Sequence, residues 1–269
     1  MSIEYFIINN SKDKKIYKEE VQDIFELVYQ KKLNNELWQH QFINSPYDNT
    51  VLFLAKDIEN KQVIGTSLMI LQKSIIENKE YKYFLFTTST ILKEYRNKGI
   101  YAELLKKQKE FAIANKVDFI LAFPNKLAYP VLKLFGGFKD IKKINLVKTN
   151  FDNIDFDSSS NSLVIDNEMF KWRFEHKKYL FYNRKNKVIV FKEFDGAYDI
   201  LAIYEKQYFD YDFVESNINT SLKINVLEEN IKNINEIEVI DTLNATCFPI
   251  NKTFDYKKIK INLLMSDVF

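Results

Sequence analysis

The stretch of sequence that decides the fold is Glu94-Tyr95-Arg96-Asn97-Lys98-Gly99-Ile100-Tyr101-Ala102-Glu103-Leu104-Leu105. It follows a run typical of a β-strand, residues 81–92, and opens a run with the apolar spacing of a helix, residues 99–115. The first backbone N–H groups of a helix have no partner within the helix, and together with the helix dipole they attract anions. Gly99 lets an anion approach the backbone closely, and Arg96 and Lys98 add positive charge beside it. We therefore predict that this junction binds a pyrophosphate.

The runs around this junction predict the order of the elements. Strands are expected at residues 3–8, 50–56, 63–73, 81–92, 117–123 and 142–148, and helices at 17–31, 34–38, 99–115 and 126–135. This order differs from the strand–helix alternation of a doubly wound sheet, because three antiparallel strands follow one another. It predicts an α/β (α+β) fold with a mixed, mostly antiparallel sheet flanked by helices.

The junction resembles the acetyl-CoA signature Arg/Gln-x-x-Gly-x-Gly/Ala of the GNAT acyltransferase superfamily. In this chain the signature runs from Arg96 to Tyr101, and Tyr101 departs from it because the family has a small residue there. A later family segment, Asn…Ala…Gly-Phe, is matched by Asn125, Ala128, Gly137 and Phe138. The loop and the tetrapeptide Phe123-Pro124-Asn125-Lys126 resemble the corresponding segments of a GNAT branch associated with bacterial surface-polysaccharide biosynthesis. The resemblance implies a GNAT-like sheet across residues 1–149.

The resemblance also implies acetyl-CoA as the cofactor and assigns residues to it. The pyrophosphate would lie on the loop residues Arg96, Asn97, Lys98, Gly99, Ile100 and Tyr101. The pantetheine arm would lie along Ser89, Thr90 and Ile91, with Asn125 near its far side. A backbone N–H of this strand would polarise the acetyl carbonyl, as in an oxyanion hole. The bulky ring of Tyr101 must then point away from the pyrophosphate.

Residues that could move protons are harder to assign. The usual family acid is a Tyr at the position that Leu132 occupies here, so Tyr129, one helical turn earlier, is the predicted substitute. His40 is the candidate base or substrate contact, because histidine titrates near neutral pH. Ser89 is the third catalytic candidate, on the strand expected to face the acceptor. The alternatives are a packing role for Tyr129 and an ordinary surface position for His40.

Aromatic residues near the expected acceptor pocket suggest what is acetylated. Trp38, Tyr47 and Tyr83 would line a cleft suited to stacking against a sugar or a nucleotide base. The GNAT branch implies an amino sugar, free or nucleotide-linked, as the acceptor. The predicted function is therefore transfer of an acetyl group from acetyl-CoA to a primary amine of a small molecule. Two alternatives are a tandem-GNAT aminoacyl transferase that uses charged tRNA and a non-catalytic acyl-CoA-binding module.

Composition argues against several other classes of protein. The 39 basic and 37 acidic residues are interspersed and give a net charge of +2, so we expect no nucleic-acid partner. The single cysteine, Cys247, cannot form an internal disulfide or a cysteine-based zinc site, and we expect no metal and an inert, buried thiol. No apolar run reaches the roughly 18–20 residues that cross a bilayer, and the N-terminus lacks a signal-peptide pattern. We expect a cytoplasmic protein with no membrane partner.

The second half of the chain is predicted to be a separate domain. We expect the acetyl-CoA-binding domain at residues 1–149, a polar linker at 150–165 and an accessory domain at 166–269. Trp172 precedes strand candidates at 179–182, 187–192 and 198–204, which repeats the pattern after Trp38, although chance could produce the same match. This half has no Arg-x-x-Gly-x-Gly loop, so we interpret it as a degenerate GNAT-like unit that shapes the acceptor site or a homodimer interface. A last strand is expected at 257–265.

Overall fold

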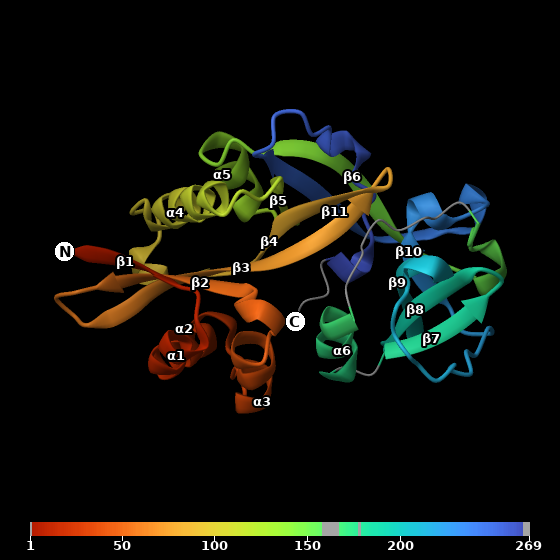
Figure 1. Ribbon diagram of the computed structural model, residues 1–269, viewed down its shortest axis with the longest axis horizontal. Coiled ribbons are helices and arrows are strands. Elements are labelled where there is room, and N and C mark those ends of the chain that lie inside the picture. The colour runs from red at the N-terminus through yellow and green to blue at the C-terminus, as the bar shows by residue number, and fades with distance from the viewer. Residues whose placement is uncertain (1, 158–166, 177–178, 266–269) are drawn as a thin grey trace. The chain divides into compact units, whose positions relative to one another are not determined.

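The computed structural model of the protein describes residues 2–157, 167–176 and 179–265, which divide into two compact units (Figure 1). The first unit contains the residues up to Gln72, then Lys82–Lys139 and Cys247–Phe254. The second unit contains Lys73–Tyr81, Asp140–Thr246 and the residues from Asp255 onward. The sequence analysis placed all of residues 166–269 in a second domain, whereas Cys247–Phe254 belong to the first unit.

The sheet of the first unit is mixed. Its strands lie in the order β1 (Ile3–Ile8), β2 (Thr50–Asp57), β3 (Gln62–Ile76), β4 (Lys79–Ile91), β5 (Phe119–Ala122) and the end of β11 (Glu238–Pro249). β1, β2 and β3 pair in antiparallel fashion, whereas β4 and β5 are parallel. The predicted α/β class with a mixed, mostly antiparallel sheet is confirmed.

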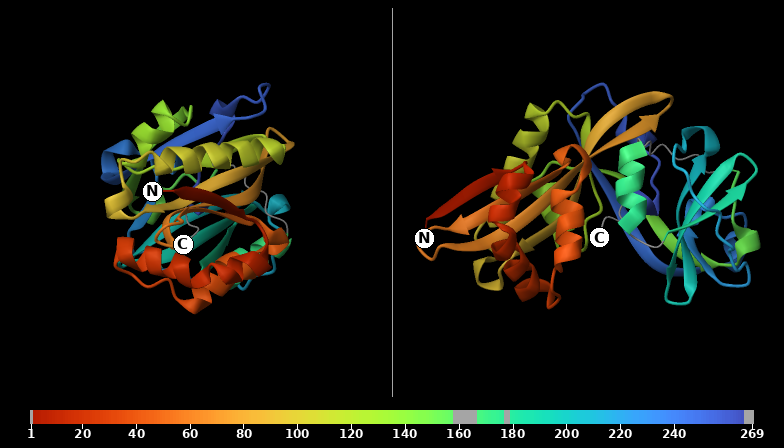
Figure 2. Two further views of the ribbon diagram at one scale, coloured as in Figure 1. Left: turned by 90° about the vertical axis from the view of Figure 1, so that its left-hand side faces the viewer. Right: turned by 60° about the horizontal axis from the view of Figure 1, so that its bottom comes forward.

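Helices cover both faces of this sheet, which explains why its strands are apolar on both sides. Figures 1 and 2 show α1 (Ser11–Ile16), α2 (Lys18–Tyr29) and α3 (Asn35–Trp38) on one face, and α4 (Ile100–Ala114) and α5 (Ala128–Leu134) on the other. Residues 51–55 of β2 are all buried. Phe111 of α4 packs against Phe53 and Phe84, with both pairs of ring centroids 5.8 Å apart. The core of the first unit thus fixes α4 on the sheet.

The second unit is built from most of the chain between β6 and the end of β11. Its strands lie in the order β11, β6 (Lys139–Thr149), β10 (Ile224–Leu227), β9 (Ala197–Glu205), β8 (Lys187–Phe194) and β7 (Tyr179–Arg184). It also contains α6 (Asn167–His176). Buried side chains from β6, β8, β9 and β10 form its own core cluster.

Two expectations for this part of the chain were wrong. Phe151, Ile154 and Phe156 of the predicted linker are buried in the core of the second unit. Asp152 between them is exposed, whereas the buried Asn153 side chain donates to the Thr149 hydroxyl at 2.9 Å. The rest of that predicted linker, residues 158–165, lies outside the described residues. The strand expected at 257–265 is instead a pair of 3-10 turns, Tyr256–Lys258 and Leu263–Met265. The last strand is β11, whose exposed first half lacks the apolar alternation that would have revealed it.

Candidate cofactor-binding site

The junction between β4 and α4 is anchored by Tyr95. Its buried hydroxyl donates to Asp57 Oδ2 at 2.9 Å and accepts from Asn60 Nδ2 at 3.3 Å. Lys98 places its ammonium group 4.8 Å from the centre of the Tyr95 ring, in a cation–π contact. Arg96 Nε donates to the carbonyl of Ile91 at 3.2 Å. The two cations that sequence placed beside the phosphate site are therefore held at the junction by contacts of their own.

The backbone of this loop has the geometry of an anion-binding nest. Asn97 and Gly99 have φ values of 62° and 76°, and Lys98 between them is not in the left-handed region. Such alternation turns successive N–H groups toward one side. Within the part of the chain that the structure describes, the N–H groups of residues 97–102 donate no hydrogen bond. These N–H groups therefore have no partner among the described residues.

Space is open above Gly99. A Cβ atom built on it would meet nothing within 4 Å, and Arg96, Asn97 and Lys98 beside it are exposed. The Tyr101 ring therefore does not cover Gly99, as the predicted cofactor position requires. The positive φ of Gly99 is a conformation in which a side chain is strained. The loop thus combines positive charge, accessible amides and an uncovered backbone.

Next to the loop, the last residues of β4 pair on one side with no strand of the described residues. The pairing of β4 with β5 ends at Phe86 and Ala122, whereas β4 continues to Ile91. The N–H of Leu92 bonds to the carbonyl of Ile64 on β3, so alternation along the strand turns Ser89 and Ile91 toward the opposite edge. Their carbonyls indeed accept side-chain hydrogen bonds, Ser89 from Tyr29 and Ile91 from Arg96. An extended ligand with amide groups could bind this edge as an added strand does.

Thr90 does not belong to this edge. By the same alternation its backbone faces β3, and its side chain is buried with a hydroxyl that no described residue bonds. The expectation that Thr90 lies along the cofactor arm is therefore not met by its orientation, whereas cofactor contacts of Ser89 and Ile91 stay a prediction.

Ser89 is the centre of a polar cluster. Its hydroxyl lies 2.7 Å from that of Ser67, which accepts from the buried Gln108 side chain at 2.9 Å. Burial raises the pKa of Tyr101 on α4, and the Ser89 side chain opposes this rise. Tyr29, at the end of α2, donates to the Ser89 carbonyl at 3.3 Å. Sequence reasoning did not identify Tyr29, Ser67 or Gln108, although a lone Gln on the apolar stripe of α4 was a signal for the last.

The Asn125 side chain caps the start of α5. Its side-chain oxygen accepts from the N–H groups of Leu127 and Ala128 at 3.0 and 2.9 Å, and its backbone carbonyl accepts from Tyr129. Asn125 is exposed, so a contact with a cofactor stays a prediction. Tyr129 is half-buried, and the ammonium of Lys133 lies 6.0 Å from its ring centre. Its role as an acid also stays a prediction.

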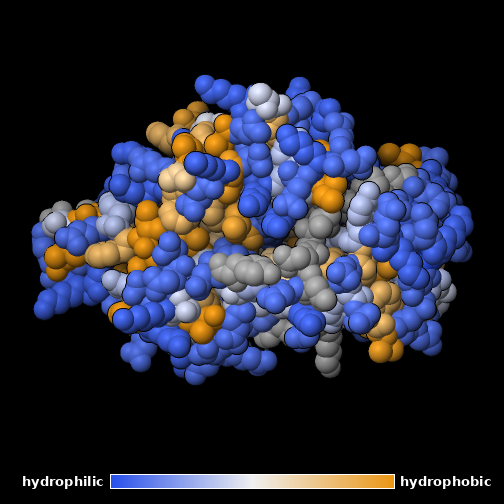
Figure 3. All heavy atoms as spheres, in the orientation of Figure 1, coloured by the Kyte–Doolittle hydropathy of each residue, from blue (hydrophilic) through white to orange (hydrophobic). Residues whose placement is uncertain are grey.

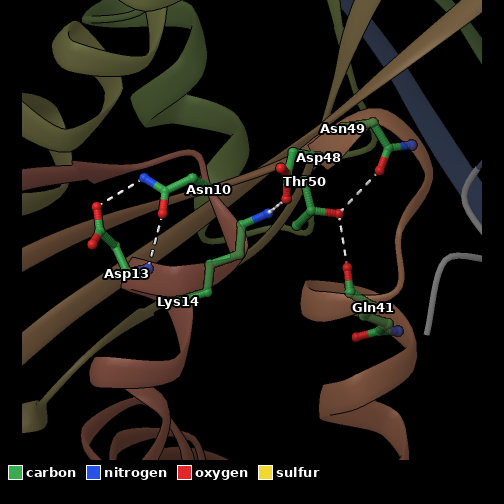
Figure 4. A network of polar contacts seen from close by, with 7 residues as sticks. All are labelled: Asn10, Asp13, Lys14, Gln41, Asp48, Asn49 and Thr50. Carbon is green, nitrogen blue, oxygen red and sulfur yellow. Dashed lines mark hydrogen bonds and ion pairs between the residues drawn. The ribbon is translucent and has the colours of Figure 1, made fainter.

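Residues 39–50 carry two expected acceptor residues, His40 and Tyr47. His40 lies half-buried on a π-helix, Gln39–Ile43, a rare turn that is frequent at functional sites. The Tyr47 side chain lies outside the described residues. Figure 4 shows how the segment is held: Lys14 Nζ lies 3.4 Å from Asp48 Oδ1, and the Thr50 hydroxyl donates to the carbonyl of Gln41 at 2.9 Å. Burial lowers the pKa of Lys14, and Asp48 opposes this shift.

Trp38 and Tyr83 do not line a cleft. Trp38 is fully buried and stacks on Phe42, with 4.2 Å between ring centroids. Tyr83 is also fully buried; it stacks on Phe119 and donates to Gln72 Oε1 at 2.8 Å. Neither ring presents a surface to a ligand, so both are removed from the expected acceptor site. Aromatic residues in a strand or a short helix are more often packed inside than exposed.

A hollow beside α2 in the first unit has acidic side chains in its lining. It is open, has a volume of about 540 Å³ and is lined by the carboxylates of Glu20, Asp23 and Glu26, which would repel a diphosphate. Among the described residues, no group of three or more His, Cys, Asp and Glu side chains could hold a metal ion. Cys247 is buried, and burial raises the pKa of its thiol, which agrees with an inert side chain. No helix in the described ranges is long and apolar enough to span a bilayer.

Apolar side chains are exposed around α5. Figure 3 shows an apolar patch over this helix, where Leu127, Leu134 and Phe135 are 83%, 77% and 68% exposed. Patches of this kind often mark protein interfaces. The expected homodimer stays a prediction, since the structure contains one chain.

Comparison with known proteins identifies the architecture. No family model and no curated protein matches the sequence. A structure of a conserved protein of unknown function from Enterococcus faecalis V583, named a probable N-acyltransferase, matches with a TM-score of 0.64 and 9% identity over 93% of this chain and 73% of that chain. GCN5-related N-acetyltransferases from Kribbella flavida and Anabaena variabilis ATCC 29413 match with TM-scores of 0.62 and 0.60 and identities of 9% and 8%. Both alignments cover 92% of this chain, and 72% and 73% of the respective relatives.

The chain has the GNAT fold. At these identities the likeness concerns the fold alone, and it extends over both units because more than nine-tenths of the chain is aligned. The GNAT-like fold expected from sequence is thus confirmed, and the cofactor role of the loop stays a prediction. The surface-polysaccharide branch within the superfamily has no counterpart among these structures.

Proposed function

We propose that the protein is an acetyl-CoA-dependent N-acetyltransferase. One observation carries this proposal: the N–H groups of residues 97–102 donate no hydrogen bond within the described residues, and they follow closely on Ser89 and Ile91, where one edge of β4 pairs with no described strand. Arg96 links the loop to this edge of β4, because its side chain donates a hydrogen bond to the Ile91 carbonyl. A single ligand with a diphosphate and an extended amide-containing arm, as coenzyme A has, fits both features.

The residues present suit this cofactor. The nest and the start of α4 supply N–H donors and partial positive charge to a diphosphate, and Arg96 and Lys98 supply full charges. The edge N–H groups of Ser89 and Ile91 would bind the pantetheine amides and the acetyl carbonyl. Acetyl-CoA would supply an activated acetyl thioester for transfer.

The chain's own contribution to catalysis would be orientation and polarisation. Ser89 is held at two atoms, its carbonyl oxygen by Tyr29 and its hydroxyl by Ser67. With Ser89 fixed in this way, its backbone N–H would stabilise negative charge on a carbonyl oxygen without reorganising. Holding an amine in line with that carbonyl would provide much of the remaining rate acceleration. Tyr129 and His40 are the proposed proton carriers.

For the acceptor, we propose a primary amine of a small molecule. The likeness of the loop to the surface-polysaccharide branch supports an amino sugar, free or nucleotide-linked. A non-catalytic acyl-CoA-binding module is the second candidate. It is favoured by the buried Leu132, which stands where the family usually has its acid.

Two measurements test these proposals in sequence. Isothermal titration calorimetry should detect acetyl-CoA binding at tens of micromolar or below, and adenosine diphosphate should compete because it contains the diphosphate. Absence of binding would refute both candidates. Release of free thiol from acetyl-CoA when a panel of amino sugars is added would then identify a transferase. Binding without thiol release for any amine of the panel would favour the binding module.

A further inference from the structure

A chain of hydrogen bonds leads from the core of the first unit to Ser89. Gln108 Nε2 donates to the Ser67 hydroxyl at 2.9 Å, and the Ser67 and Ser89 hydroxyls lie 2.7 Å apart. Gln108 and Ser67 are fully buried, whereas Ser89 is half-buried. The three side chains come from α4, β3 and β4, so the chain connects two strands and a helix and ends at the candidate site.

The number of protons gives this chain a direction, because a hydroxyl group has one proton to donate. If Ser89 donated to Ser67, the buried Ser67 proton would have no acceptor, since no other described residue forms a hydrogen bond with the Ser67 hydroxyl. A buried polar group without a partner is unfavourable, so Ser67 donates to Ser89. The Ser89 proton is then directed away from the core.

Two further observations support a functional role for this chain. Burial raises the pKa of Tyr101, and Ser89 opposes the rise, as a hydroxyl that donates toward the Tyr101 oxygen does. The Gln108 carbonyl oxygen is buried and has no partner among the described residues, so an apolar side chain would be less costly at this position of α4. The donor that Gln108 supplies to Ser67 explains why a glutamine is there.

We propose that the Ser89 hydroxyl is a second hydrogen-bond donor to the acyl oxygen of the cofactor, and that Gln108 and Ser67 are positioning residues that keep its proton available. The inference rests on the proposed function, in which the Ser89 N–H binds the same oxygen. A serine hydroxyl lies close to its own backbone nitrogen by covalent geometry, so one oxygen can accept from both. Donors fixed in advance stabilise the negative charge that develops on this oxygen during transfer.

Ser89→Ala removes the hydroxyl and keeps the backbone N–H. The acetyl carbonyl is present in acetyl-CoA and absent from free coenzyme A, so the ratio of the two affinities reports on this oxygen. The preference for acetyl-CoA should fall roughly twofold to tenfold in Ser89→Ala, the range for one net hydrogen bond. The carbonyl stretching band of isotope-labelled acetyl-CoA should lie at higher frequency on the variant than on wild type, because a hydrogen bond to the oxygen weakens the C=O bond.

Gln108→Glu tests the direction of the chain through pH. Below its pKa the new carboxyl group is neutral and can donate to Ser67 as the amide does. Above its pKa the carboxylate can only accept, so Ser67 would donate to it and Ser89 would donate to Ser67. The preference for acetyl-CoA should therefore match wild type at low pH and fall toward that of Ser89→Ala as pH rises. Burial raises the pKa of a carboxyl group, so the fall is expected near neutral pH or above.

The test is calorimetric titration of the purified full chain with acetyl-CoA and with free coenzyme A between about pH 6 and about pH 9, together with infrared difference spectra of the bound labelled acetyl-CoA. Gln72→Glu is the matched control, since Gln72 is another buried glutamine of the first unit, and its side chain accepts from Tyr83 instead of joining the polar cluster. Circular dichroism verifies the fold of each variant at each pH.

The outcomes separate this inference from the function on which it rests. A preference that falls in Ser89→Ala, and falls with pH in Gln108→Glu but not in Gln72→Glu, supports the proposal. An unchanged preference and carbonyl band in Ser89→Ala would overturn it and leave the proposed function intact. A Gln108→Glu protein that behaves like Gln72→Glu would overturn the positioning role of Gln108. If Gln108→Glu does not fold, Ser89→Ala decides alone. Failure of wild type to bind acetyl-CoA would refute the proposed function, and this inference with it.

Discussion

Gly99→Asp is expected to abolish binding of coenzyme A while the protein stays folded. An aspartate carboxylate at this position would compete for the same N–H groups that a diphosphate needs and would repel it. A like-charge contact of several kcal/mol corresponds to a loss of affinity of about 100-fold or more. The fold should survive, because a side chain at Gly99 meets nothing within 4 Å and the left-handed φ of 76° costs about 1–2 kcal/mol.

Gly196→Asp is the matched control for this change. Gly196 has a φ of 72°, and a Cβ built on it also meets nothing within 4 Å. Both variants therefore carry similar backbone strain, and urea unfolding should show similar losses of stability. Only Gly99→Asp should lose the calorimetric signal with coenzyme A. Retained affinity in Gly99→Asp would show that the diphosphate position is wrong.

Trp38→Ala is expected to lower the free energy of unfolding of the first unit by about 3–5 kcal/mol, the range for truncating a large buried aromatic side chain. Trp38 is fully buried and stacked on Phe42, so its removal leaves a cavity that the surroundings can fill only in part. Urea unfolding followed by circular dichroism measures the effect.

The size of the loss distinguishes the two interpretations of this residue. Trp38→Phe keeps a ring on Phe42 and should cost less than half as much as the alanine variant. A residue on an exposed cleft wall would instead lose about 0.5 kcal/mol or less on truncation. A loss of stability that small would contradict the buried position of Trp38 and support its expected place in the acceptor cleft.

The backbone geometry of the proposed cofactor loop could be predicted from sequence because it depends on neighbouring residues only. Anion binding at the start of a helix needs only the strand, the loop and the first turn, and these are contiguous from Tyr95 to Tyr101. The positive φ of Gly99 and the accessible amides agree with that prediction. The strands and helices around the loop were also recognisable, since their apolar periodicity is strong.

Features that depend on distant residues were not predictable in the same way. Whether Trp38 faces a core or a cleft depends on Phe42 and on the strand beneath it, and the residue type fits both positions. The polar cluster joins Tyr29, Ser67 and Gln108 to Ser89 across separations of 22 to 60 residues along the chain. β11 was missed because a strand whose first half is exposed does not need apolar alternation.

The most direct test of the central claim is backbone amide hydrogen exchange, resolved by residue, with and without coenzyme A. The claim is that the N–H groups of residues 97–102 bind the diphosphate of the cofactor. Saturating coenzyme A should slow exchange at these residues and at Ser89 and Ile91, because bound amides exchange only when the contact opens. The hairpin at Gly196 should be unaffected. If coenzyme A binds and exchange at residues 97–102 does not change, the site lies elsewhere.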